Sequence, residues 1–344
     1  MTSVIANSNL HSIQTPSILW TSEENQLQTV QVIVHQLRSV ASGVVEVTLV
    51  AENQGLLPKS TPGAHIDLHL PNGQTRAYSL TQAGSLESQS RYVVAVGLAA
   101  CSRGGSSYVH HNLALGQVLT VGTPRNLFAL VDDPAPAVLI AGGIGITPLL
   151  AMAMQRLRQE LPWDMVYAAR SRAGAAYATE LAAFADHVRF HFDDENHGRA
   201  LDLHGVLVDI SPQTHIYCCG PLGLMEKVRE LAAGHPSDHL HFESFGGNPR
   251  GPTQDNRPFV VELARKRKTV DVAAHQSILE ALETCGVVLP SVCREGVCGS
   301  CECAVLEGEV DHRDQILSPE DKASHQVLMA CVSRARGERL VLDI

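Results

Sequence analysis

Long apolar runs and an excess of positive charge are both missing from this sequence of 344 residues. No stretch approaches the roughly 18 consecutive apolar residues that a membrane-spanning helix needs, so we expect a soluble protein. Lys and Arg total 26 against 36 Asp and Glu, and the net charge of -10 has the wrong sign for broad attraction to nucleic acid or anionic lipid. Neither nucleic acid nor a membrane is therefore an expected partner.

Features of an export signal are lacking as well. The first two dozen residues contain no Lys, no Arg and no continuous apolar block, so we expect a cytoplasmic protein. Residues 1–27, which precede the first strand pattern, are interpreted as a disordered extension. The nine cysteines are an odd number, and five of them lie after Gly286. In a cytoplasmic chain, such clustering favours metal ligation over disulfides.

The length predicts two or three domains, and the chain divides by pattern. Residues 28–131 contain short alternating or β-branched runs between Gly, Pro and Asn turns, which is typical of an antiparallel barrel or sandwich. Residues 132–240 alternate strand and helix patterns, which predicts a parallel sheet. Residues 241–258 are rich in Gly, Pro and Asn and are expected to be a linker. Residues 259–344 predict a small mixed sheet, with Ser277 capping its helix.

Four cysteines share the spacing of a plant-type [2Fe–2S] site, C-x4-C-x2-C followed by a distant fourth: Cys293, Cys298, Cys301 and Cys331. The backbone must wrap closely around the inorganic sulfides, and Gly296 and Gly299 allow this approach. A structural zinc site, the main alternative, normally presents two C-x2-C pairs, and only one such pair is present here. Cys285 and Cys303 are interpreted as packing residues.

A glycine-rich turn between a strand and a helix, AVLIAGGIGITP, is a candidate nucleotide site. Its glycines are Gly142, Gly143 and Gly145, and they remove side chains where a pyrophosphate would approach. The dinucleotide fingerprint G-x-G-x-x-G is not met, because Pro148 takes the third glycine position. A second turn of small residues, Cys218, Cys219, Gly220 and Pro221, follows a later strand. Both turns are expected at the carboxyl edge of one sheet, where open α/β folds bind ligands.

The motifs of this sequence occur in the same order as those of a known protein family. RAYS (76–79), SRGGS (102–106), GGIGITP, YCCGP, HFESFG and the cysteine loop together resemble the phthalate dioxygenase reductase and vanillate demethylase reductase family over residues 28–344. The resemblance implies an iron–sulfur flavoprotein with FMN, NADH and a [2Fe–2S] cluster, serving a separate Rieske-type oxygenase. It also implies the fold: an antiparallel β-barrel flavin domain, an α/β parallel-sheet nucleotide domain and a C-terminal β-grasp ferredoxin domain.

Site residues follow from the same resemblance. It implies that the flavin is held by Arg76, Ala77, Tyr78 and Ser79, and that its phosphate is held by Arg103, Gly104, Gly105 and Ser106. It assigns NADH to Gly142, Gly143, Gly145, Cys218, Gly220 and Pro221. Three residues are expected at the reacting rings: Thr147 at the flavin edge, Phe245 beside the isoalloxazine and Cys219 near the nicotinamide.

The three cofactors make chemical sense together, because a nicotinamide gives up two electrons as a hydride while a [2Fe–2S] cluster accepts one at a time, and a flavin converts between them. We therefore expect a reductase that passes electrons from NADH to an oxygenase. The chain lacks the paired C-x-H and C-x2-H patterns of a Rieske centre, so oxygen activation is expected elsewhere. Two alternatives remain: an FAD-containing reductase of a di-iron monooxygenase, or a non-enzymatic redox sensor.

The choice between the two nicotinamide nucleotides depends on the second strand of the nucleotide domain. Arg170, Ser171 and Arg172 follow this strand, where a ribose is expected, and no acidic residue follows at once to repel a 2′-phosphate. Charge alone would tolerate NADPH, whereas the family resemblance favours NADH. We expect a preference for NADH with appreciable use of NADPH.

Overall fold

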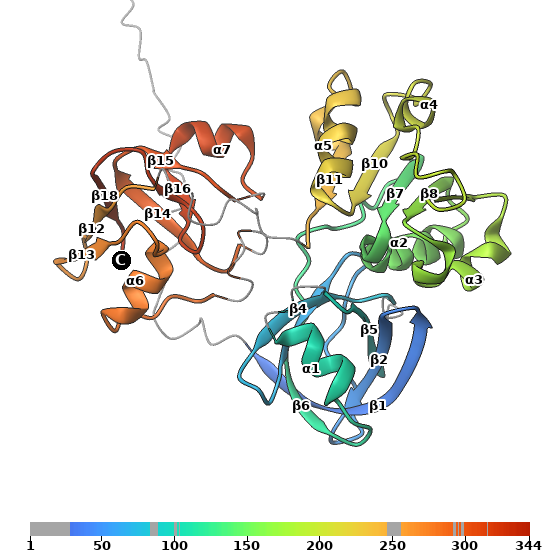
Figure 1. Cartoon of the computed structure of the whole chain (residues 1–344), viewed down its shortest axis with the longest axis horizontal. Helices are drawn as coiled ribbons and strands as arrows, with labels where there is room; N and C mark the ends of the chain where they lie inside the picture. The colour runs from blue at the N-terminus through green and yellow to red at the C-terminus, as the bar shows by residue number, and fades with distance from the viewer. Residues whose placement is uncertain are drawn as a thin grey trace, which may run out of the picture.

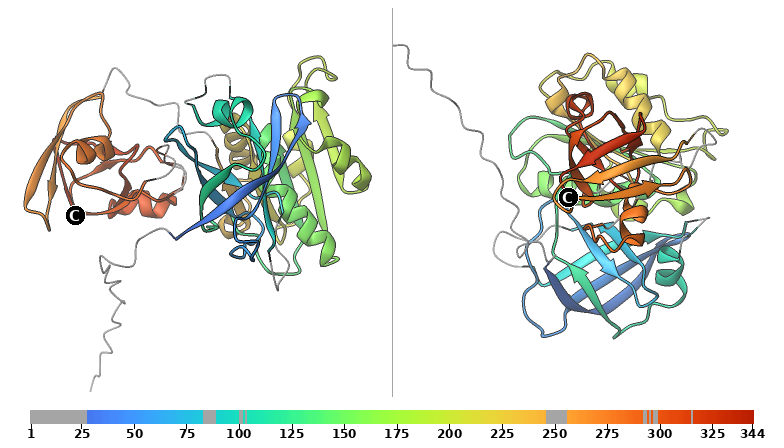
Figure 2. Two further views of the ribbon diagram at one scale, coloured as in Figure 1. Left: turned by 90° about the horizontal axis from the view of Figure 1, so that it is seen from below. Right: turned by 90° about the vertical axis from the view of Figure 1, so that its left-hand side faces the viewer.

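The computed structural model describes residues 28–82, 89–99, 102, 104–245, 256–291, 294, 296, 299–314 and 316–344. Figure 1 shows three folded parts in chain order: a strand-rich blue-green part, a green-yellow part with helices around its sheet, and an orange-red C-terminal part. In both views of Figure 2 the first two parts adjoin each other, and the C-terminal part lies to one side in the left view. The expected multidomain architecture is confirmed.

The first domain is one six-stranded antiparallel sheet in the order β4-β3-β6-β1-β2-β5. Its strands are β1 (Thr29–Ala41), β2 (Val44–Ala51), β3 (His65–His69), β4 (Thr75–Ser79), β5 (Arg91–Gly97) and β6 (Val118–Gly122), with helix α1 (Gly105–His111) between the last two. Leu80 forms a bridge with Val94, and the Thr81 N–H donates to Val93 O at 2.9 Å. These contacts join the two outer strands, so the sheet closes into the predicted barrel.

The second domain is a five-stranded parallel sheet in the order β11-β10-β7-β8-β9. Its strands are β7 (Ala137–Gly142), β8 (Trp163–Ala169), β9 (Val188–Phe192), β10 (His215–Cys219) and β11 (Leu240–Glu243). The helices between them are α2 (Ile146–Arg158), α3 (Ala178–Leu181), α4 (Leu203–Leu207) and α5 (Leu222–Leu231). The central strands β7 and β10 are almost wholly buried, as expected of parallel strands covered on both faces.

One predicted boundary needs correction. The linker was expected to begin at residue 241, but residues 240–243 form β11, which pairs in parallel with β10. The nucleotide domain therefore continues to Glu243. The segment HFE is too short to show a period of its own, and the Gly- and Pro-rich residues that follow it dominate the composition. The remainder of the expected linker, up to residue 255, lies largely outside the described residues.

The C-terminal domain has a mixed five-stranded sheet in the order β13-β12-β18-β14-β16. These strands are β12 (Phe259–Leu263), β13 (Lys268–Val272), β14 (Glu302–Glu307), β16 (Val327–Met329) and β18 (Arg339–Leu342), and β15 (Val310–Asp311) pairs with β17 (Arg334–Ala335). Helices α6 (Ile278–Thr284) and α7 (Pro319–Ser324) complete the domain. Strands β12 and β18 are parallel, whereas the neighbouring pairs are antiparallel. A helix packed on such a mixed sheet is the expected β-grasp fold.

Helix α6 begins where its sequence predicts. Ser277 accepts a hydrogen bond from the Glu280 N–H at 3.2 Å, and the Ser277 N–H donates to Glu280 Oε2 at 2.8 Å. This reciprocal pair is a capping box, and it satisfies backbone groups at the helix start. Gly286, with a φ of 75°, supplies the left-handed residue just beyond the helix end.

The barrel and the nucleotide domain are joined by a buried polar contact. Glu46 of β2 accepts hydrogen bonds from Arg38 of β1 at 3.0 Å and from the Tyr177 hydroxyl of the nucleotide domain at 2.8 Å. The Ser42 N–H also donates to Ala173 O at 2.7 Å. These contacts fix the barrel against the loop after β8. Across the part of the chain that the structure describes, no helix has the length and apolar character to cross a membrane.

Candidate functional site

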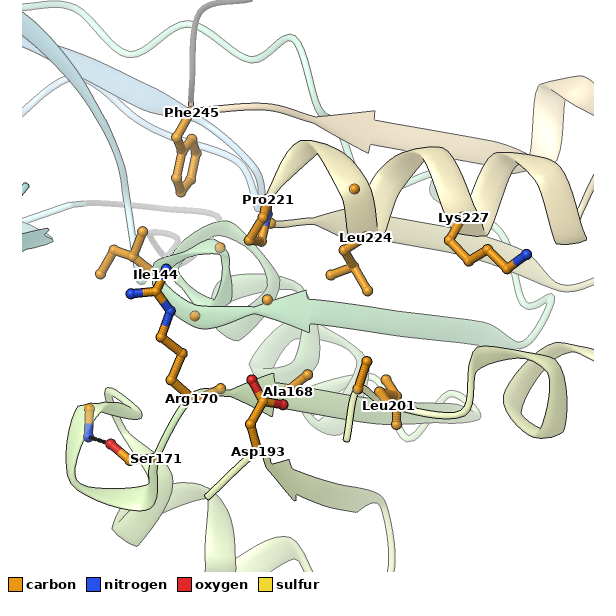
Figure 3. A pocket seen from close by; sticks show the side chains of 18 of the residues that line it. Ile144, Ala168, Arg170, Ser171, Asp193, Leu201, Pro221, Leu224, Lys227 and Phe245 are labelled. Atoms are coloured by element: carbon orange, nitrogen blue, oxygen red, sulfur yellow. Dashed lines mark hydrogen bonds between the residues drawn. The ribbon is translucent and has the colours of Figure 1, made fainter. Parts of the chain in front are cut away.

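A pocket of about 1140 Å³ lies along the carboxyl edge of the parallel sheet. Its lining comes from the turns that follow five strands, including Gly143 after β7, Arg170 after β8, Asp193 after β9, Gly220 after β10 and Phe245 after β11 (Figure 3). With four strand spacings between β11 and β9, the edge spans about 19 Å. The pocket therefore suits an extended ligand lying across the strand ends.

The two glycine turns predicted from the sequence meet at the centre of this pocket. A Cβ on Gly145 would lie 2.2 Å from Cys219 O, and a Cβ on Gly142 would lie 2.7 Å from Pro221 Cδ. Neither glycine can carry a side chain without displacing the other turn. The structure thus brings together Gly142, Gly143, Gly145, Gly220 and Pro221, as expected.

Three expected site residues lie beneath the pocket surface. The Thr147 side chain is 2% exposed, and its hydroxyl donates to Ile144 O at 3.1 Å. Cys218 and Cys219 are equally buried in the core, and burial raises the pKa of the Cys218 thiol to about 12 and that of Cys219 well above its ordinary value. Both thiols therefore stay protonated at neutral pH. None of the three is among the described residues that line the pocket.

Phe245, in contrast, lines the pocket at its barrel end with its side chain 38% exposed. It follows β11, the strand at one edge of the sheet. Figure 3 shows its ring pointing down over the open end of the pocket near Ile144. An exposed aromatic ring at this place is available to stack on a planar ligand.

Charged residues line the pocket on the side of the sheet away from β11. Arg170 and Ser171 line it, and so does Asp193, which sequence reasoning missed (Figure 3). Arg172 does not reach the pocket: its Nε and Nη2 donate to Glu195 at 2.9 and 3.0 Å, and its guanidinium stacks over Phe192. In the sequence, Asp193 is the first residue of the acidic pair that ends the strand pattern VRFHFDD. The fold places this pair beside the end of β8.

The expected flavin motifs form one surface on the barrel. Arg76, Ala77 and Tyr78 are half-buried on β4, and Ser79 is buried at its end. A Cβ on Gly105 at the start of α1 would lie 2.6 Å from Arg76 Cγ, so the RAYS strand and the SRGGS turn are in contact. An arginine beside a glycine turn suits a phosphate group, and the residues present fit the flavin.

The other members of the SRGGS turn are held locally. Gly104 has a φ of 93°, in the left-handed region that favours glycine. The Ser106 hydroxyl donates to Ser102 Oγ at 3.0 Å, and Ser102 Oγ also accepts from the Gly104 N–H at 3.2 Å. Arg103, which was expected to contribute to the phosphate site, lies outside the described residues.

A carboxyl group that the sequence did not single out joins the two domains at the flavin surface. The Ser79 hydroxyl donates to Glu243 Oε2 at 3.3 Å, which links the end of β4 to the end of β11. Part of the Glu243 side chain reaches the surface, but desolvation of its carboxyl raises the pKa to about 8. Glu243 is therefore largely protonated at neutral pH and can exchange a proton there. The motif HFESFG contains Glu243, but the family resemblance assigns a role only to Phe245 in that motif.

The cysteine site is described in part. Cys301 precedes β14 and Cys331 follows β16, and the Ala330 N–H donates to Cys301 O at 3.0 Å. The two cysteines therefore lie beside each other at the ends of two paired strands, and both are buried. Gly296 and Gly299 both have a φ of 73°, as a loop that wraps a cluster requires. Two buried cysteines beside a glycine loop fit a [2Fe–2S] cluster. Cys293 and Cys298 lie outside the described residues.

The other two cysteines of this domain are placed as packing residues. Cys303 is buried in the core of the domain, where burial raises the pKa of its thiol to about 12. Cys285 is half-buried just after α6 and packs against the same core. Neither expectation from the sequence needs revision.

Comparisons with known proteins agree with this geometry. Residues 139–230 match the model of the oxidoreductase NAD-binding domain, and residues 261–336 match that of the 2Fe-2S iron-sulfur cluster binding domain. Vanillate O-demethylase oxidoreductase of Pseudomonas sp. strain HR199 is 39% identical over 320 residues, which cover 92% of this chain and 100% of the relative.

Two further relatives extend the comparison. The phthalate 4,5-dioxygenase oxygenase reductase subunit of Pseudomonas putida is 40% identical over 309 residues, covering 89% of this chain and 94% of the relative. A solved phthalate dioxygenase reductase, described as a modular structure for electron transfer from pyridine nucleotides to [2Fe–2S], superposes with a TM-score of 0.72 at 36% identity, covering 92% of this chain and 98% of the other. This chain therefore belongs to the phthalate dioxygenase reductase and vanillate demethylase reductase family, as the reductase component of an oxygenase system that uses NADH, FMN and a [2Fe–2S] cluster.

Proposed function

We propose that this chain is the cytoplasmic reductase of a Rieske-type oxygenase, and that each domain binds the cofactor assigned to it by position. When bound, FMN supplies the exchange between a two-electron hydride from NADH and the single electrons that the cluster accepts. The observation that carries the proposal is the continuous pocket from Asp193 to Phe245, whose barrel end adjoins the contact between Glu243 and Ser79.

The nucleotide pocket orients its ligand by shape and charge. The glycines of its central turns let the pyrophosphate of NADH approach the backbone, because a side chain there would clash with the opposite turn. Arg170 and Asp193 bind the adenosine half, since they follow β8 and β9, on the opposite side of the central strand β7 from β11 and Phe245. Phe245 at the other end covers the reacting rings and excludes water from them.

The barrel binds the flavin along β4 and the turn before α1. Arg76, Ala77, Tyr78 and Ser79 bind the ring system and ribityl chain, and Arg103, Gly104, Gly105 and Ser106 bind the phosphate. Thr147 and Cys219 act from below the pocket floor: the Thr147 hydroxyl holds the Ile144 turn, and Cys219 packs its carbonyl against Gly145. Both are therefore assigned to positioning the two rings rather than to proton transfer.

The ferredoxin domain binds the cluster that accepts electrons from FMN. Cys293, Cys298, Cys301 and Cys331 are the proposed ligands of the two irons. Iron and acid-labile sulfide are each expected at two per chain, with one FMN released on denaturation. Zinc without sulfide would overturn the ligand assignment, and FAD in place of FMN would favour a reductase of the di-iron monooxygenase type.

The type of oxygenase is tested by electron delivery. Chain reduced by NADH is mixed rapidly with a Rieske oxygenase, with a di-iron hydroxylase and with cytochrome c as a non-specific acceptor. We expect the Rieske protein to be reduced at least tenfold faster, at equal concentration, than the di-iron protein. Reduction of the di-iron protein at the same rate or faster would overturn the Rieske assignment. Failure to oxidise NADH with any acceptor would favour a redox sensor.

A further inference from the structure

The cluster loop rests on a segment that the ligand assignment leaves unexplained. A Cβ on Gly296 would lie 3.0 Å from Asp314 Cα, and a Cβ on Gly299 would lie 3.0 Å from Ile316 Cδ1. Gly296 and Gly299 stand on either side of Cys298 in the chain. Asp314 and Ile316 therefore lie against two glycines that flank a cluster ligand in the chain.

Asp314 places a buried carboxylate beside the cluster loop. Its side chain is 0% exposed, and its Oδ2 accepts a hydrogen bond from the Leu317 N–H at 2.9 Å. Its Oδ1 has no hydrogen-bond partner within the residues that the structure describes. A buried carboxylate costs several kcal/mol unless a positive charge lies beside it.

Lys322 of helix α7 supplies that positive charge. Its Nζ lies 3.5 Å from Asp314 Oδ2 and donates to the Asp314 carbonyl oxygen at 2.7 Å. The side chain is 32% exposed, so the ammonium bridges the buried carboxylate and the solvent. Ser318 caps helix α7 at its start, and its hydroxyl accepts from the Asp321 N–H at 3.0 Å. This cap directs the first turn of the helix, and with it Lys322, towards Asp314.

The nearest histidine does not share this role. His312 Nδ1 lies 3.7 Å from Asp314 Oδ1, and its ring stacks on that of His325. Burial lowers the pKa of His312, and the charges of His325 and Lys322 lower it further, against the opposite effect of Asp314. His312 is therefore neutral near pH 7 and adds no charge to the pair formed by Asp314 and Lys322.

We propose that the Asp314–Lys322 ion pair tunes the reduction potential of the [2Fe–2S] cluster. Reduction adds one electron to the cluster, converts one ferric iron to ferrous iron and makes the site more negative by one charge, with the flavin as the electron donor. A carboxylate behind the loop opposes this change, and the ammonium beside it offsets that opposition. Both residues act through the environment of the loop, as positioning residues do, and neither binds iron. The inference rests on the cluster assignment made above.

The experiment measures the cluster potential in the full chain with its cofactors. Lys322→Met, Asp314→Asn and the double variant are first assayed for iron and sulfide and then titrated by photoreduction, following the reduced cluster by electron paramagnetic resonance. We expect Lys322→Met to lower the ratio of reduced to oxidised cluster about tenfold at a fixed potential, which corresponds to 59 mV for one electron. Asp314→Asn is expected to raise the ratio, and the double variant to restore it.

Opposite shifts distinguish electrostatic tuning from damage to the loop, which would move both single variants in one direction. Lys322→Arg keeps the charge and is expected to leave the potential unchanged, whereas Lys322→Gln, neutral at a partly exposed position, is expected to follow Lys322→Met. The matched control is Lys266→Met, on the exposed turn between β12 and β13. Equal potentials in Lys322→Gln and the unsubstituted chain would overturn the proposal. Because photoreduction uses neither NADH nor the oxygenase, failure of the proposed function leaves this readout intact.

Discussion

At the scale of single residues, Glu243 is the group whose chemistry the fold changes most. Its carboxyl has a pKa of about 8 because desolvation outweighs the hydrogen bond from Ser79, whereas an unfolded glutamate has a pKa near 4.5. The folded state therefore holds a proton that the unfolded state releases. Stability from this group is fully present below pH 4.5 and is lost as the pH rises towards 8.

Glu243→Gln tests this linkage. The amide cannot ionise, so the free energy of unfolding of the variant, relative to that of the unsubstituted chain, is expected to rise by about 1–3 kcal/mol between pH 5 and pH 8.5. Urea unfolding at the two pH values gives the difference. Glu226→Gln, at an exposed position on α5, is the control and should show no such trend. A constant difference between Glu243→Gln and the unsubstituted chain would mean that the Glu243 carboxyl is ionised in the fold.

Nucleotide selection is a second property of single side chains. Because Arg170 lines the pocket while Arg172 is held by Glu195, Arg170 is the residue placed to attract a 2′-phosphate, and Asp193 is placed to repel one. Arg170→Ala is expected to lower kcat/KM for NADPH about tenfold and that for NADH less than threefold, the loss of one charged contact. Asp193→Asn should raise the use of NADPH.

Arg172→Ala is the matched control for these measurements. It removes the same side chain from the neighbouring loop, so kcat/KM for the two nucleotides should change by the same factor. Stronger discrimination by Arg172 than by Arg170 would contradict the assignment of this role to Arg170. An unsubstituted chain that prefers NADPH would contradict the NADH preference itself.

At the scale of elements, local patterns predicted the longer strands and helices, because these are long enough to show a period. Helix α6 shows this best, since Ser277 and Glu280 form the capping box that their spacing predicts. Strand β11 was missed because four residues beside a Gly- and Pro-rich segment have no detectable period, and their pairing with β10 is a long-range contact. Short parallel edge strands depend on the sheet that they join.

The site residues divide in the same way. Glycine turns and cysteine spacing are local signals, so Gly142, Gly145 and Cys301 could be identified from the sequence. Asp193 and Glu243 could not, because each gains its role from a strand end that lies beside a distant one in the fold. Burial of a side chain also depends on the whole fold. No local pattern shows that Thr147 points away from the pocket into the core.

At the scale of the whole molecule, each of the three domains is assigned its own cofactor. The contacts between the domains predict which steps continue when one cofactor is lost. The barrel and the nucleotide domain share hydrogen bonds through Glu46 and Tyr177, and their sites meet at Ser79 and Glu243. The ferredoxin domain has its own apolar core and follows a Gly- and Pro-rich segment. We therefore expect that reduction of the flavin requires only the first two domains.

The variant Cys298→Ala separates reduction of FMN by NADH from electron delivery to the acceptor. Loss of one thiolate ligand removes the cluster, so electron delivery to the oxygenase or to cytochrome c is expected to fall at least a hundredfold, because the carrier between FMN and the acceptor is lost. Reduction of FMN by NADH, followed by stopped-flow absorbance, should stay within about twofold of the unsubstituted rate, since the pocket and its alignment on the barrel are untouched. Cys303→Ala is the control: Cys303 is a neighbouring buried cysteine that packs in the core, so both steps should survive its loss. If FMN reduction in Cys298→Ala slowed as much as the downstream transfer, the ferredoxin domain would have to support the flavin site directly.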